Sequence, residues 1–154
     1  MLQVRNILYF TPFYFRNGNA AKNKYFVVLS ILEKQVVIAS LPTSKDHIPY
    51  ISNHKDGCIE IPEANLNCFV ITTETCVTEC GKHFPVNTFL YGHLIQKYEI
   101  DYLNELYLFE NIDYQIWGKM TEQLFRKMIN CFKNSKSVKR KYKTILSSHQ
   151  NKPQ

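Results

Sequence analysis

Short apolar runs separated by turn-forming residues dominate the first part of the chain. They are rich in Val, Ile, Phe and Tyr, the pattern typical of β-strands. The predicted strands are VRNILYF (4–10), KYFVVLSI (24–31), QVVIASL (35–41), GCIEI (57–61), NCFVITT (67–73) and NTFLYGHLI (87–95). Only residues 32–34 join the second and third strands, so this pair is predicted to be an antiparallel hairpin. Both strands are almost continuously apolar, which indicates burial on both faces.

The hydrophobic period changes to that of a helix near residue 119. In MTEQLFRKMINCF (120–132), apolar residues recur on one side, and Thr121 stands where an N-cap is expected. A second helix is predicted in SVKRKYKTIL (137–146), with Val138, Tyr142 and Ile145 on its apolar side. Residues 99–118 are ambiguous, although their apolar spacing hints at one short helix.

Strands followed by helices predict an α+β fold, either a small bent antiparallel sheet or an SH3-like barrel, with C-terminal helices packed on it. The 154 residues and 18.2 kDa match a single domain. Within it, 1–98 is expected to be mainly β, 99–146 mainly α, and 147–154 a flexible tail. A composition of 45% hydrophobic and 14% aromatic residues excludes intrinsic disorder.

Positive charge is concentrated at the C-terminal end. Residues 1–122 hold ten Lys or Arg against thirteen Asp or Glu, whereas 123–154 hold nine and none. Such a basic segment favours a polyanionic partner, with RNA or DNA ahead of a membrane because no strongly apolar face accompanies it. The run could hold a single-stranded RNA by phosphate contacts together with stacking on the interleaved Tyr142. The alternative is a solvated tail that aids solubility. The predicted RNA-binding residues here are Lys139, Arg140, Lys141 and Lys143.

The N-terminal stretch MLQVRNILYFTPFYF is aromatic, but polar residues and a proline interrupt it before it reaches the length of a signal core or a membrane span. A cytoplasmic protein that does not enter a membrane is therefore expected. The five cysteines are an odd number, and reduced thiols are the simpler interpretation in that compartment.

The best metal-ligand candidate is Cys76-x3-Cys80-x2-His83, which Cys58 and Cys68 could complete. Its spacing differs from the usual C-x2-C of zinc sites, so structural thiols are preferred. We therefore predict no metal and no cofactor.

Candidate chemistry lies at the ends of the hairpin strands. Lys24 begins the second predicted strand, and a tight hairpin pairs positions symmetrically about its turn, so Lys24 is expected to lie near Thr43. A cation beside the hydroxyls of Thr43 and Ser44 suits a phosphodiester, because it offsets the charge that develops on the phosphorane oxygens. Lys45 and His47 follow as further RNA contacts. The alternative is a polar hairpin rim whose hydroxyls make only local turn hydrogen bonds.

At these residues the sequence resembles the MazF/PemK-like toxin superfamily. Members carry a basic residue before an apolar strand, here Asn23-Lys24 before YFVVLS, and a strand that ends in hydroxyls, here LPTS (41–44). The common pattern has arginine followed by proline. Lys24 followed by Tyr25 is closer to the ToxN/AbiQ toxins of type III toxin–antitoxin systems, which have a lysine there, a Thr-Ser pair and basic C-terminal helices.

The resemblance covers residues 20–47 by motif and 119–146 in general character. It implies a bent antiparallel sheet of SH3-like barrel type. It also implies metal-independent endoribonuclease activity that leaves a 2′,3′-cyclic phosphate and a 5′-hydroxyl. Lys24, Thr43 and Ser44 would be the catalytic group and Lys45 a phosphate contact. The partners implied are single-stranded RNA and an antitoxin, either an RNA or a small protein.

A different class of function remains open, namely a non-catalytic SH3-like module that binds RNA or a protein through the same basic surface. His47 and His54 are candidate general bases or acids, whereas His93 is expected in the core. Trp117 and Tyr114 are expected to pack the terminal helices against the sheet rather than to stack on bases. The sequence leaves the oligomeric state open.

Overall fold

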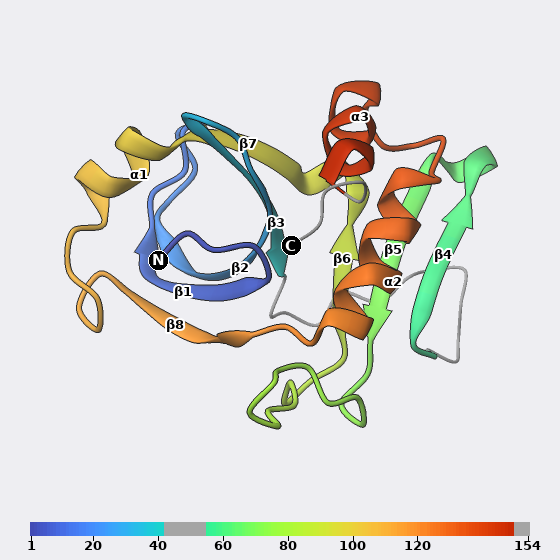
Figure 1. Cartoon of the computed structure of the whole chain (residues 1–154), viewed down its shortest axis with the longest axis horizontal. Helices are drawn as coiled ribbons and strands as arrows, with labels where there is room; N and C mark the ends of the chain where they lie inside the picture. The colour runs from blue at the N-terminus through green and yellow to red at the C-terminus, as the bar shows by residue number, and fades with distance from the viewer. Residues whose placement is uncertain (42–54, 150–154) are drawn as a thin grey trace.

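The computed structural model describes residues 1–41 and 55–149, which form two antiparallel sheets and three α-helices (Figure 1). The five-stranded sheet has the order β7-β3-β2-β1-β8, and the three-stranded sheet has the order β4-β5-β6. Neither described sheet closes into a barrel. The predicted α+β class, with bent antiparallel sheet and C-terminal helices, is confirmed. The strands are β1 (Asn6–Phe13), β2 (Lys22–Ile31), β3 (Gln35–Leu41), β4 (Gly57–Ile61), β5 (Leu66–Ile71), β6 (Thr88–Tyr91), β7 (Ile95–Glu99) and β8 (Tyr114–Lys119).

The β2–β3 hairpin forms as predicted. Its register runs from Ile31 opposite Val36 to Tyr25 opposite Leu41, with a shift between Val28 and Ser30. Side chains of a strand alternate between the two faces of the sheet. Both faces are covered here, which explains why the two sequences are almost continuously apolar.

The run NTFLYGHLI does not form the single strand that was predicted. A 3-10 turn, Gly92–Leu94, divides it into β6 of the smaller sheet and β7 of the larger one. A Cβ on Gly92 would lie 2.5 Å from Asn67 Oδ1 and 2.5 Å from Val138 Cγ2. Only glycine therefore allows the chain to pass this closely between the sheets.

Residues 99–118, which were ambiguous from the sequence, contain a helix and a strand. Helix α1 spans Ile100–Leu106, and β8 then adds to the edge of the larger sheet, beside β1. Trp117 packs against the core to which α2 and α3 contribute, as predicted. Tyr114 instead packs on Phe10 in a separate core, away from those helices.

The two C-terminal helices are α2 (Glu122–Lys133) and α3 (Arg140–His149). The Oγ1 atom of Thr121 accepts a hydrogen bond from the Leu124 N–H at 3.3 Å, which confirms the predicted cap. Helix α3 continues into the segment that was expected to be a tail. Helix α2 covers β4 and β5, and α3 packs against α2 and β2. Among the residues described, no helix has the length and apolar character that crossing a membrane requires.

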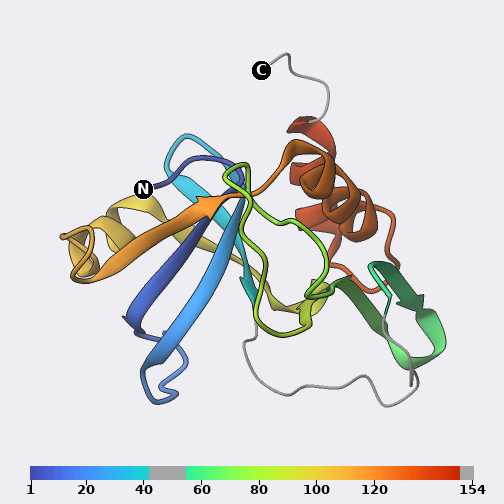
Figure 2. The same ribbon diagram turned by 90° about the horizontal axis from the view of Figure 1, so that it is seen from below.

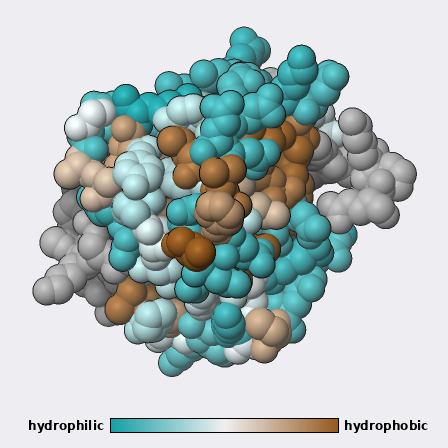
Figure 3. Space-filling view, turned by 90° about the vertical axis from the view of Figure 1, so that its left-hand side faces the viewer, coloured by the Kyte–Doolittle hydropathy of each residue, from teal (hydrophilic) through white to brown (hydrophobic). Residues whose placement is uncertain are grey.

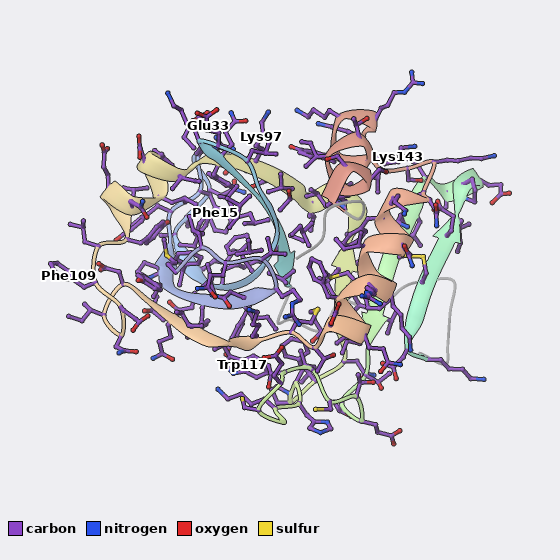
Figure 4. All side chains as sticks on the ribbon, in the orientation of Figure 1. Phe15, Glu33, Lys97, Phe109, Trp117 and Lys143 are labelled. Atoms are coloured by element: carbon purple, nitrogen blue, oxygen red, sulfur yellow. A yellow bond between two sulfur atoms is a disulfide. The ribbon has the colours of Figure 1, made fainter. Side chains whose placement is uncertain are left out.

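Two apolar cores lie on opposite faces of the five-stranded sheet. The first fills the space between the two sheets and α2 and α3, with Phe69 and Phe132 among its largest members. The second is aromatic and lies inside the curl of the larger sheet, where Figure 4 shows Phe15; it includes Phe10 and Phe26. Figure 2 shows the smaller sheet with α2 and α3 on one side of the molecule and α1 on the other.

A disulfide joins Cys58 of β4 to Cys131 of α2, with the two Cα atoms 5.3 Å apart. The expectation that all five cysteines are reduced thiols is therefore wrong for this pair, while Cys68, Cys76 and Cys80 are free. Disulfides are rare in cytosolic proteins, so this bond argues against the reducing compartment that the sequence suggested.

Candidate nucleic-acid interface

The predicted catalytic lysine lies at the edge of the larger sheet. Lys24 is half-buried near the beginning of β2, opposite Phe10 of β1. Because Tyr25 pairs with Leu41, Lys24 is one residue beyond the last described pair of the hairpin. The other predicted residues of this site, Thr43, Ser44, Lys45 and His47, lie outside the described residues, as does His54. The proximity of Lys24 and Thr43 stays a prediction.

A row of aromatic side chains begins at Tyr25, which follows Lys24 in β2 and therefore points to the other face of the sheet. The Tyr9 and Tyr25 rings stack with their centroids 4.3 Å apart, and the Trp117 ring meets Tyr25 edge-on at 6.1 Å. Trp117 also stacks on Phe84, at 5.1 Å. Neighbouring strands β1 and β2 supply the tyrosines, and β8 supplies Trp117, which Figure 4 labels. Tyr9, Tyr25 and Trp117 are all partly exposed.

A cation accompanies this row. The Lys82 Nζ lies 5.0 Å from the centroid of the Trp117 ring and donates a hydrogen bond to the Trp117 carbonyl at 2.5 Å. Burial and the neighbouring Tyr9 raise the pKa of Tyr25, so its phenol stays protonated near neutral pH. Partly exposed rings beside an ammonium can stack on unpaired bases and attract phosphates. Sequence reasoning missed Tyr9, Tyr25 and Lys82, because only the strand register brings them to Trp117.

The basic residues of α3 form a second surface. Lys139, Arg140 and Lys141 are exposed, whereas the Lys143 Nζ donates a hydrogen bond to the Ser135 carbonyl at 2.9 Å. Tyr142 is only 7% exposed and belongs to the first core. The prediction that Tyr142 stacks on bases is therefore wrong: its ring lies 5.0 Å from the Lys141 Nζ but is buried, and this surface offers cations for phosphates without an exposed ring.

The Cys76, Cys80 and His83 side chains engage local groups. The Cys76 Sγ lies 3.5 Å from the Thr78 carbonyl, and the Cys80 Sγ lies 3.3 Å from the Thr78 hydroxyl. His83 Nδ1 lies 3.1 Å from the Thr73 carbonyl. Within residues 1–41 and 55–149, no group of three or more His, Cys, Asp or Glu side chains could hold a metal ion.

The remaining cysteines do not add ligands to that set. Cys58 is oxidised in the disulfide, and burial raises the pKa of the Cys68 thiol to about 12. Cys68 is thus a neutral structural thiol near pH 7. The prediction that His93 belongs to the core is wrong, because its side chain is exposed and contacts the ring of Tyr91 at 5.5 Å.

Comparison with known proteins yields no match: no family model, no curated protein and no solved structure is similar to this chain. Its function must therefore be inferred from the chemistry of its own residues. Two of its surfaces carry such chemistry, namely the strand end with Lys24 and the aromatic row, and the exposed cations of α3.

Proposed function

We propose that this protein is a toxin-like endoribonuclease that cleaves single-stranded RNA without a metal ion. The observation that carries the proposal is the position of Lys24, one residue beyond the last described pair of the hairpin, whose other strand is followed in the sequence by Pro42, Thr43 and Ser44. An ammonium group at this place stabilises the charge that develops on the phosphorane oxygens. Thr43 and Ser44 would hold the phosphate.

In the proposed reaction, the substrate's own 2′-oxygen attacks the adjacent phosphorus and loses its proton. The bond from phosphorus to the 5′-oxygen breaks, and that oxygen takes up a proton. The products are a 2′,3′-cyclic phosphate and a 5′-hydroxyl. No covalent enzyme intermediate forms, so the protein contributes positioning, charge stabilisation and proton transfer.

Substrate binding would use the two surfaces described above. The partly exposed tyrosines offer stacking for unpaired bases on the face of the sheet opposite to Lys24, and the α3 cations offer phosphate contacts. Helix α3 packs against β2, the strand that carries Lys24. An enzyme of this kind would need a neutralising partner, an antitoxin RNA or a small protein.

Cleavage in the presence of EDTA tests the proposal directly. The purified protein should cut single-stranded RNA into fragments with 2′,3′-cyclic phosphate and 5′-hydroxyl ends, identified by end-specific labelling. The double variant Thr43→Ala, Ser44→Ala, purified in parallel, should lose this activity because it lacks the hydroxyls that hold the phosphate. Intact RNA, or equal cleavage by the double variant, would remove the enzyme assignment.

A non-catalytic RNA-binding module is the second candidate. The observation that favours it is the exposed set of cations on α3, which binds phosphates whether or not Lys24 acts on them. This candidate differs from the first in one measurable respect, because the bound RNA would be recovered intact in the EDTA experiment.

Replacing the α3 cations should weaken RNA binding under either candidate. For the variant Lys139→Ala, Arg140→Ala, Lys141→Ala, the slope of log affinity against log salt should fall by about 2, since each phosphate contact to a single strand contributes about 0.7. Fluorescence anisotropy with an uncleavable 2′-O-methyl RNA measures it. Lys34→Ala, Lys55→Ala removes exposed cations elsewhere and serves as control. An unchanged slope would place the RNA on another surface.

A further inference from the structure

An exposed apolar surface lies at the end of the molecule farthest from α2 and α3. It consists of Leu106, Leu108, Phe109 and Ile112, from the end of α1 and the loop before β8, and is called here the α1–β8 surface. Leu108, Phe109 and Ile112 are 65%, 59% and 69% exposed. Figure 3 shows this side of the molecule with hydrophobic side chains gathered between hydrophilic ones. Exposed apolar side chains that gather in this way mark interaction sites.

The loop that presents these side chains is held in a defined turn. The Asp113 carboxylate accepts a hydrogen bond from the Phe109 N–H at 2.9 Å, and the Asn111 N–H donates to the Tyr114 carbonyl at 2.6 Å. The Thr11 hydroxyl anchors the loop to β1 by donating to the Ile112 carbonyl at 3.2 Å. A partner would therefore meet a pre-organised surface and pay little ordering entropy there.

Acidic residues stand beside and among the residues of the α1–β8 surface along the chain. The run from 99 to 113 contains five Asp or Glu and neither Lys nor Arg. Of these, Glu99, Asp101, Glu105 and Glu110 are exposed, and Glu99 accepts a hydrogen bond from Gln35 Nε2 at 2.7 Å. In the part of the chain that the structure describes, the ion pairs are Arg5 with Glu79 and Arg126 with Glu122, so these carboxylates have no cationic partner within 4.0 Å. An apolar centre with an uncompensated negative rim attracts a positively charged ligand.

We propose that the α1–β8 surface binds a cationic protein segment whose apolar side chains cover Leu108, Phe109 and Ile112. A second copy of this chain in a two-fold dimer would bring one acidic rim against the other. RNA and anionic membranes would be repelled for the same reason. The α1–β8 surface lies on the opposite side of the molecule from α3, and the proposal does not depend on RNA cleavage.

Strand addition is not the mode of binding that this surface offers. Strand β8 is the edge of the larger sheet, but two of its carbonyls already accept hydrogen bonds within the chain. The Lys119 carbonyl accepts from the Glu79 N–H at 2.9 Å, and the Trp117 carbonyl accepts from Lys82. The partner must therefore be recognised by side chains, as when an amphipathic helix lays its apolar face on a hydrophobic surface.

Two labelled peptides of one amphipathic pattern, one built from Lys and Leu and the other from Glu and Leu, test the proposal on the full chain. Anisotropy should show binding of the Lys/Leu peptide and at least about tenfold weaker binding of the Glu/Leu peptide. Leu108→Ser, Ile112→Ser should weaken Lys/Leu binding about tenfold by removing apolar contact area. Glu105→Lys, Glu110→Lys should also weaken Lys/Leu binding about tenfold, because it reverses the charge of the acidic rim.

Val86→Ser is the matched control, because Val86 is also an exposed apolar residue, at 46%, but lies in a different loop. This variant should bind the Lys/Leu peptide like the unaltered chain. Equal binding of the two peptides, no binding of either, or an equal loss in the Val86 variant overturns the proposal. The proposal is also overturned if light scattering shows that the unaltered chain is a dimer and that Leu108→Ser, Ile112→Ser dissociates it. A second copy of the chain would then occupy the α1–β8 surface.

Discussion

Cys58→Ser should lower the free energy of unfolding by about 4 kcal/mol. The disulfide joins residues 73 positions apart, and in the chain-entropy model a cross-link over a loop of this size removes that much conformational freedom from the unfolded chain. Cys58 is the better position to change, because it is exposed on β4 whereas Cys131 is buried on α2. The substitution thus breaks the bond without opening a cavity. Guanidinium titration under non-reducing conditions measures the effect.

Two comparisons distinguish the effect of losing the disulfide from the effect of replacing the Cys58 side chain. Dithiothreitol should destabilise the unaltered protein to the level of Cys58→Ser and leave the variant unchanged. Cys76→Ser removes an exposed thiol that is not in a disulfide and should unfold like the unaltered chain. If Cys58→Ser and the unaltered protein had the same midpoint without reductant, the disulfide would contribute nothing to stability.

The parts of the fold that the sequence predicted are those with local signals. The β2–β3 hairpin is two apolar runs joined by a very short turn, and α2 combines a cap at Thr121 with an apolar stripe. Both follow from residues close together in the chain. Strand β8 has no such signal, because Gln115 and Ile116 are both exposed and its partner β1 lies about one hundred residues earlier. Its place in the sheet depends on tertiary pairing.

The division of 87–95 between two sheets is also a tertiary feature. Its apolar and aromatic residues favour a strand, and Gly92 was the available clue, because isolated glycines in strand patterns often mark a close backbone approach. What Gly92 approaches, Asn67 and Val138, could not be deduced from the run itself. The Cys58–Cys131 pairing is similar, since an odd number of cysteines does not indicate which two meet.

The sequence could place a residue of the candidate site only where counting residues outward from the turn of one hairpin was enough. That count placed Lys24 near the end of the hairpin, and the described register has a shift between Val28 and Ser30 that brings Leu41 opposite Tyr25. The row of Tyr9, Tyr25 and Trp117 required the register of three strands. The burial of Tyr142 could have been predicted from the sequence of α3. The helical periodicity that exposes the α3 cations places the Tyr142 ring on the side that faces the core.

Lys24→Met should reduce kcat/KM for single-stranded RNA by about 10²- to 10³-fold, the loss typical when one donor to a developing oxyanion is removed. Methionine keeps much of the apolar length of lysine but carries no charge. Lys22→Met provides the matched control on the same strand. Lys22 is exposed, pairs with Phe13, and places its Nζ 6.0 Å from the centroid of the Phe15 ring. Its loss should change kcat/KM by no more than about twofold, because an exposed charge at the strand's beginning contributes only screened attraction to RNA.

Single-turnover kinetics in EDTA separate the two ways in which Lys24 could act. If its ammonium group stabilises the phosphorane, the rate constant for cleavage falls while the affinity for 2′-O-methyl RNA is retained, since that interaction is realised only in the transition state. Thermal unfolding of both variants shows whether β2 is intact. Equal losses of cleavage in Lys22→Met and Lys24→Met, accompanied by equal losses of affinity, would make Lys24 an ordinary phosphate contact and leave the reaction without its proposed charge stabiliser.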